Sequence, residues 1–211
     1  MTSRQPCRLF VLVAREAHRA VIFRRGPSKQ VQLILWHTDT DTFIPGQWLK
    51  GRIYEHRSDL SPDGRFLIYF AAKYKGTYYA WTAISKPPYL TALVLWPKDS
   101  CWNGGGLFEA SANLWLNHAP EESQAAFGAL PPSWALRIND QFTLGEDRPV
   151  ETARLERDGW ECRRKLRFEK VMAKREGPTI HELIAMLKVS ENLSDADQER
   201  MKYWMSLVSD V

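Results

Sequence analysis

Short hydrophobic runs separated by polar turns predict a series of β-strands along the first two thirds of the chain. Leu9–Val13 and Ala20–Phe23 are runs of four or five apolar residues, and Gly26 with Pro27 gives a turn signal after the second run. Runs of this length that are bounded by turn residues are typical of strands. We therefore expect an N-terminal β-hairpin.

The same pattern continues along the chain. Gln30–Trp36 begins with alternating polar and apolar residues and then becomes continuously apolar, as expected of a strand that enters a buried layer. The polar stretch His37–Asp41 is predicted to turn the chain. Further strands are predicted at Gln47–Leu49, Gly51–Tyr54, Arg65–Phe70, Thr77–Ile84, Tyr89–Trp96, Asn113–Leu116, Trp134–Ile138 and Gln141–Leu144.

The best local signal is the turn Asp59–Gly64, which leads directly into the strand Arg65–Phe70. Pro62 presets its φ angle for a turn, Asp63 can bond to its own backbone, and Gly64 accepts a positive φ. Each of these residue types therefore suits its position in the turn. The turn in turn supports the prediction of the strand that follows it.

The C-terminal part of the chain changes character. Val150–Phe168 is predicted to form a hairpin about Asp158 and Gly159, since Asp-Gly is a preferred two-residue turn. Thr179 and Glu182 have the spacing of a helix capping box, and Ser194 with Asp197 opens a second helix in the same way. Apolar residues at helical spacing follow each start: Ile180, Leu183, Ile184 and Leu187 in the first helix, and Met201, Trp204, Met205 and Val208 in the second.

These patterns give three parts. Residues 1–145 are predicted to form a β-rich domain, residues 146–176 a basic hairpin or extension, and residues 177–211 a two-helix segment. The two helices are expected to form a hairpin that packs on the protein's own sheet or on a partner. The fold class predicted is mainly β with a C-terminal helical hairpin.

Leu60–Tyr69, with its Ser-Pro-Asp-Gly turn, resembles the turn and strand of β-propeller blades of the WD40 and TolB-like type. The resemblance implies blade-like sheets and a platform for binding partners. A closed propeller needs at least four blades of four strands, whereas this β-rich region has room for roughly three. We therefore expect an incomplete propeller-like stack, or a twisted sheet or sandwich that uses the same turn.

The composition is that of a folded globular protein. The chain has 211 residues, of which 44% are hydrophobic and 26% charged. Charged residues follow the apolar stretch Leu9–Ala14 at once, so it lacks the form of a signal peptide, and no segment has the apolar length of a membrane helix. The expected location is the cytoplasm, with no membrane partner.

The sequence has none of the motifs that would identify an enzyme. It contains no nucleophile elbow, no phosphate-binding loop that ends in Lys-Ser/Thr and no dinucleotide-binding glycine pattern. Cys7, Cys101 and Cys162 lie far apart and suggest neither a disulfide framework nor a paired-cysteine metal site. We predict no cofactor, and the sequence favours a protein that is not an enzyme.

The nine tryptophans are the most unusual feature of the composition. Most are expected to fill the core of a sheet, but some should remain at the surface. Trp48 and Trp102 stand beside Gly and Pro turns, and Tyr78 with Tyr79 places one ring on each face of a strand. Exposed aromatic residues are typical of interface hot spots. The favoured function is therefore a protein-interaction, scaffold or regulatory module that uses an aromatic β surface and the C-terminal helices.

A first alternative is nucleic-acid binding. The chain carries a net charge of +4, and residues 151–176 hold nine Lys or Arg against six Asp or Glu. Trp160 would serve as a stacking platform within the basic stretch 154–175. The candidate binding cations are Arg163, Arg164, Lys165 and Arg167. Charges of alternating sign also occur on exposed hairpins and helices that bind nothing.

A second alternative is a metal-assisted hydrolase. His37, Asp39 and Asp41 alternate along the chain and would share one face of an extended strand, with His56 converging from a neighbouring strand end. The competing interpretation, which we favour, is that Asp39 and Asp41 are ordinary turn residues.

Overall fold

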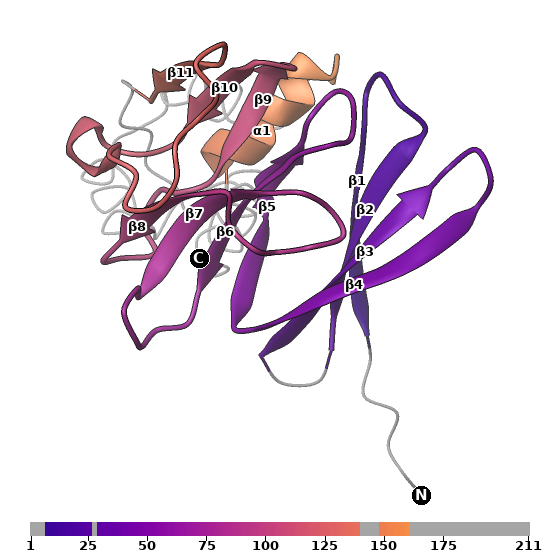
Figure 1. Cartoon of the computed structure of the whole chain (residues 1–211), viewed down its shortest axis with the longest axis horizontal. Coiled ribbons are helices and arrows are strands. Elements are labelled where there is room, and N and C mark those ends of the chain that lie inside the picture. The colour runs from indigo at the N-terminus through magenta and orange to yellow at the C-terminus, as the bar shows by residue number, and fades with distance from the viewer. Residues whose placement is uncertain (1–6, 27–28, 140–147, 161–211) are drawn as a thin grey trace, which may run out of the picture. The chain divides into compact units, whose positions relative to one another are not determined.

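A computed structural model describes residues 7–26, 29–139 and 148–160 of the chain. The strand predicted at Gln141–Leu144 and the helices predicted within 177–211 lie outside these residues. Within the described part the protein is mainly β, as predicted, and its strands form three separate sheets (Figure 1). None of these sheets closes into a barrel or a propeller.

The first sheet is an antiparallel meander of β1 (Arg8–Val13), β2 (Arg19–Arg25), β3 (Gln30–His37) and β4 (Thr42–Lys50). The second is another antiparallel meander of β5 (Arg52–Leu60), β6 (Leu67–Ala72), β7 (Ala80–Ser85) and β8 (Val94–Lys98). The third has the spatial order β11 (Ala135–Ile138), β10 (Asn113–Leu116) and β9 (Gly106–Ala110), with β10 and β11 parallel. A short 3₁₀ helix, η1 (Pro120–Glu122), and one α-helix, α1 (Arg148–Arg157), complete the described elements.

The β5–β8 sheet is a middle layer. Every residue of β6 and β7 is buried, which an antiparallel sheet shows only when both of its faces are covered. Figure 1 shows this sheet between the other two. Its first face packs against the β1–β4 sheet through a core that includes Phe23, Leu33 and Tyr69. Its second face packs against β9 and β10 through Trp96 and Phe108.

The turn Asp59–Gly64 is present as predicted. Gly64 has a φ of +69°, and the Ser61 hydroxyl accepts hydrogen bonds from the backbone N–H groups of Arg65 and Phe66. The turn therefore connects β5 to β6 and fixes the register in which the two strands pair.

One prediction near a Gly residue was wrong, and one strand beside glycines was missed. Pro45 and Gly46, expected to mark a turn, lie inside β4 at an irregularity in its pairing with β3. A Cβ atom on Gly46 would lie 2.0 Å from the carbonyl oxygen of Pro88, so glycine is needed there for a close backbone approach. The strand β9 was missed because it begins at the last of three consecutive glycines, Gly106, and contains only a short apolar run.

The hairpin predicted about Asp158 and Gly159 was also wrong, because the residues before it form α1. Gly159 has a φ of +84° and its N–H donates to the carbonyl of Glu156, while the N–H of Trp160 donates to the carbonyl of Leu155. This is the Schellman arrangement that ends helices with a glycine. Since Asp-Gly suits both a tight hairpin and a helix end, the dipeptide alone did not distinguish them.

Candidate functional site

The outer face of the β1–β4 sheet is the face turned away from the β5–β8 sheet. Cross-strand pairing arranges its residues in three rows. The rows are Leu9, Arg24, Gln32 and Trp48; Val11, Ile22, Ile34 and Pro45; and Val13, Ala20, Trp36 and Phe43. All of these residues are apolar except Arg24 and Gln32, so the outer face is nearly as apolar as the covered one.

Several side chains of the outer face are accessible. Val11 is 42% exposed, Val13 is 62% exposed and Phe43 is 50% exposed. Trp36 stacks on Phe43 with ring centroids 5.5 Å apart, and the Arg24 guanidinium lies 5.8 Å from the ring centroid of Trp48. An antiparallel sheet that faces water normally carries polar residues on that side. An apolar outer face is instead typical of a sheet that another layer covers.

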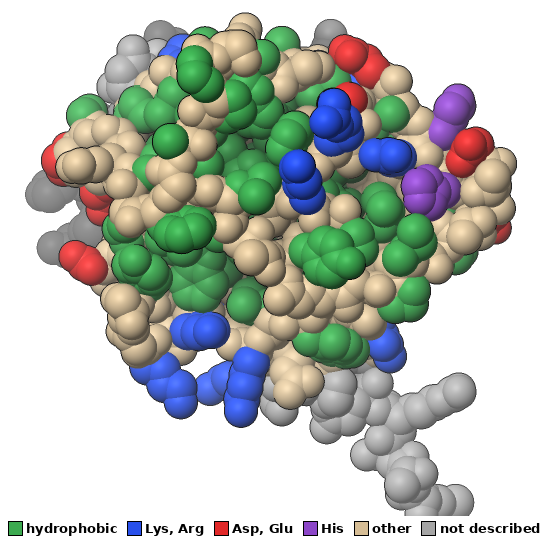
Figure 2. Space-filling view, viewed as in Figure 1, with side chains coloured by type: hydrophobic (Ala, Val, Ile, Leu, Met, Phe, Trp, Pro, Cys, Tyr) green, Lys and Arg blue, Asp and Glu red, His purple; other side chains and the backbone are tan. Residues whose placement is uncertain are grey.

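The predicted aromatic residues do not come together. Trp48 is 46% exposed on β4, whereas Tyr78 packs against the core and Tyr79 contacts Tyr74 in the loop before β7. Trp102 is 62% exposed in a loop whose backbone carbonyls at Cys101 and Asn103 accept hydrogen bonds from Arg57. Trp160 is exposed beyond α1. No ring contact joins Trp48, Tyr79, Trp102 and Trp160 to one another within the described part. Figure 2 likewise shows exposed hydrophobic side chains in several separate areas of one face.

The basic stretch is described only at its beginning. Arg154 is buried and donates to the carbonyl of Ser58, and Arg157 pairs with Asp59 and Asp158. These two cations are therefore committed to contacts within the protein. The candidate nucleic-acid contacts Arg163, Arg164, Lys165 and Arg167 lie outside the described residues.

The candidate metal ligands are separated. Asp41 accepts a hydrogen bond from the indole N–H of Trp36 at 2.9 Å, and Asp39 accepts one from the N–H of Thr40, so both serve the β3–β4 turn. His56 instead pairs with Glu151 of α1 at 2.8 Å. Among the described residues, no group of three His, Cys, Asp or Glu side chains is placed to hold a metal ion.

A buried hydrogen-bonded chain resembles a nucleophile and its base. The Nε2 atom of His118 lies 2.7 Å from the Thr82 hydroxyl, and its Nδ1 lies 3.1 Å from the carbonyl oxygen of Glu122. A carbonyl can only accept, so Nδ1 carries the proton and Thr82 donates to Nε2. Both side chains are shielded from solvent, at 0% and 1% exposure. A substrate cannot reach these two side chains in the folded state. The hydrogen bonds of Thr82 and His118 therefore have a structural role.

Comparison with protein-family models, curated proteins and solved structures gives no match. No helix in the described part is long and apolar enough to cross a bilayer.

The residues Leu9, Val11 and Val13 were missed as site residues because their run was interpreted only as one strand of an N-terminal hairpin. The signal was present in the sequence. Continuous apolar runs at Leu9–Val13 and Leu33–Trp36 place apolar side chains on both faces of a sheet, and the two faces need two covering layers.

Proposed function

We propose that this protein is a non-enzymatic interaction module that associates with a second copy of itself through the outer face of the β1–β4 sheet. The observation that carries the proposal is the apolar composition of that face. It matches the composition of the sheet faces that other layers of the same protein cover. A second β-sheet is the covering layer that such a face fits, because sheets stack face to face about 10 Å apart.

A second copy fits the face by symmetry and by charge. Two-fold dimers are the commonest oligomers, and they bring the same patch of each subunit together. Arg24 lies at one end of the outer face, and the turn with Asp39 and Asp41 follows its other end. A two-fold axis perpendicular to the strands would place the Arg24 end of one copy on the acidic turn of the other. The charges at the ends of the face would then be complementary.

The area of the outer face determines how strong a dimer we expect. Four strands at about 4.8 Å spacing and three rows along them cover roughly 400 Å² per copy. The total of roughly 800 Å² is below the size of stable interfaces and belongs to weak, transient association. We therefore expect a dimer that forms in the micromolar range or above.

The test introduces charge on the outer face, at exposed residues of its edge strand β1. The double variant Val11→Lys/Val13→Lys of the full chain is expected to weaken self-association at least about tenfold, because two ammonium groups would lose water on burial. Sedimentation velocity over a range of concentrations measures it. The matched control is Tyr89→Lys/Leu93→Lys, which adds the same charge at exposed apolar residues outside the β1–β4 sheet and should leave association unchanged.

Two outcomes would reject this function. The wild-type chain could remain a monomer at the highest concentration measured. Alternatively, the Tyr89→Lys/Leu93→Lys control could weaken association as much as the Val11→Lys/Val13→Lys variant. The loss would then come from the added net charge and not from a change in the outer face.

A further inference from the structure

A hollow of about 480 Å³ opens where the first two strands of the β1–β4 sheet meet β5. Three arginines line it: Arg8 from β1, Arg25 from β2 and Arg52 from β5. The remaining lining residues are Leu9, Phe10, Tyr54, Glu55 and His56. This arginine pocket brings together residues that lie up to 48 positions apart in the sequence.

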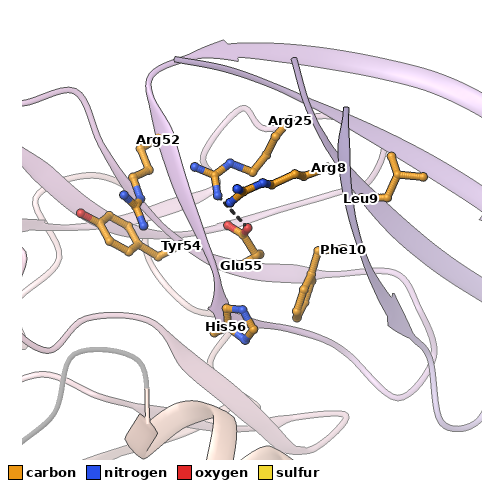
Figure 3. Close-up of a pocket in the computed structure, with 8 residues that line it drawn as sticks. All are labelled: Arg8, Leu9, Phe10, Arg25, Arg52, Tyr54, Glu55 and His56. Carbon is orange, nitrogen blue, oxygen red and sulfur yellow. Dashed lines mark hydrogen bonds and ion pairs between the residues drawn. The ribbon is translucent and has the colours of Figure 1, made fainter. Parts of the chain in front are cut away.

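Two of the guanidinium groups are held in place by the protein. Glu55, whose side chain is only 13% exposed, pairs with Arg25 at 3.2 Å. The Arg52 guanidinium lies 4.4 Å from the ring centroid of Tyr54, which is 7% exposed. Burial raises the pKa of the Tyr54 hydroxyl above its ordinary value, so the ring stays neutral against Arg52. Figure 3 shows the Arg8 and Arg25 side chains turned toward Glu55.

The pocket has a surplus of positive charge. Glu55 is its one carboxylate, and it can neutralise only one of the three arginines. In the described part of the chain, neither Arg8 nor Arg52 forms an ion pair with a carboxylate. The lining therefore carries two more positive than negative charges, beside the ring of Phe10.

We propose that the arginine pocket binds a small organic phosphate monoester. A phosphate monoester carries a charge of about −1.5 to −2 at neutral pH, which matches the two uncompensated cations. Guanidinium groups bind phosphate oxygens through paired, charge-assisted hydrogen bonds. The volume lies within the range of small-molecule sites. Phe10, which contacts the His56 ring edge to face at 4.8 Å, offers an apolar wall to the organic part.

The probe is phenyl phosphate, compared with inorganic phosphate and benzoate, titrated into the full chain by calorimetry. Phenyl phosphate is expected to bind more tightly than either, since only it combines the dianion with an apolar group. Arg8→Gln and Arg52→Gln should each weaken binding about tenfold or more, because each removes charge-assisted hydrogen bonds. Glu55→Gln should strengthen binding several-fold, because it removes the competing carboxylate.

The controls make the same changes in charge away from the pocket. Arg65→Gln alters the exposed arginine that follows the Asp59–Gly64 turn, and Glu121→Gln alters an exposed glutamate of η1. Neither should change the affinity for phenyl phosphate at moderate ionic strength. An equal loss in Arg65→Gln and Arg8→Gln would show that only the net charge matters and would overturn the proposal.

Two further results would also overturn it. Phenyl phosphate could fail to bind at low ionic strength. A single-stranded oligonucleotide could instead bind more tightly than phenyl phosphate and lose its affinity in Arg8→Gln and Arg52→Gln, which would assign the pocket to nucleic acid. Self-association through Val11 and Val13 is measured without a ligand, so the outcomes of the two proposals are distinguishable.

Discussion

Replacing Asp59 by alanine is expected to lower the free energy of unfolding by about 3–5 kcal/mol, the cost typical of breaking a buried ion pair. The Asp59 side chain is 4% exposed at the end of β5. Its Oδ2 accepts hydrogen bonds from Arg157 at 2.5 Å and from the N–H of Phe108 at 2.8 Å, and its Oδ1 accepts a second one from Arg157 at 3.2 Å. The variant would leave these donors in a buried site without their carboxylate.

The position of α1 depends on this carboxylate. A ten-residue helix is too short to be stable alone in water, so α1 needs its contacts with the sheets. Val150 supplies an apolar contact with Leu107 and Trp115, and Arg157 supplies a buried ion pair with Asp59. Amide hydrogen exchange in α1 should therefore accelerate in Asp59→Ala more than in β6 or β7.

Chemical denaturation of Asp59→Ala and Asp99→Ala measures the effect. Asp99 is exposed beyond β8, and its replacement should change the free energy of unfolding by no more than about 0.5 kcal/mol. A double-mutant cycle with Arg157→Ala should give a total loss smaller than the sum of the single losses, because either change breaks the same pair. A loss below about 1 kcal/mol in Asp59→Ala would contradict the structural role assigned to this carboxylate.

The elements predicted correctly are those that local signals determine. The strands β1, β2 and β3 follow apolar runs, and the turn Asp59–Gly64 follows residue types with fixed backbone preferences. The helix α1 could not be predicted in this way. The apolar residues Val150 and Ala153 of this helix pack against Leu107 and Trp115, which are distant in the sequence and come near only in the folded protein.

The candidate site was harder to predict than the fold. Arg8, Arg25, Arg52 and Glu55 stand in no motif, and the packing of two sheets alone makes them neighbours. The same reason explains why Asp59 was assigned to a turn: its partners Phe108 and Arg157 come from β9 and α1. Trp48 and Trp102, which the sequence offered as candidates for exposed aromatic residues, do lie at the surface. Their exposure alone did not show which part of the surface forms one continuous apolar face.

His118 should make the protein less stable in acid. Burial, together with the nearby Lys98 ammonium, lowers the pKa of His118 from 6.5 to about 3 in the folded state. The unfolded chain takes up a proton on this histidine near pH 6.5, whereas the folded chain does not, so stability falls as the pH decreases between 6.5 and 3. The expected loss from pH 7 to pH 4 is about 3 kcal/mol from this group alone.

The hydrogen-bonded chain explains why the folded state resists protonation. The N–H of Gly105 donates to the Thr82 hydroxyl, which donates to Nε2 of His118. Protonated His118 would place an N–H against that hydroxyl proton, and the charge would lie near Lys98, which pairs with Glu122 in a buried position. Thr82 could no longer donate to the imidazole, so folding and protonation of His118 oppose each other.

The measurement is chemical denaturation from pH 7 to pH 4 of the wild type, His118→Gln and His18→Gln. His118→Gln should be less stable at pH 7, because its side chain does not reproduce both hydrogen bonds, but its stability should fall less steeply with decreasing pH. His18 is exposed in the β1–β2 turn, and His18→Gln should keep the wild-type slope. Parallel pH profiles for wild type and His118→Gln, or an imidazole NMR signal of folded His118 that titrates near pH 6.5, would show that this histidine is not held neutral by the fold.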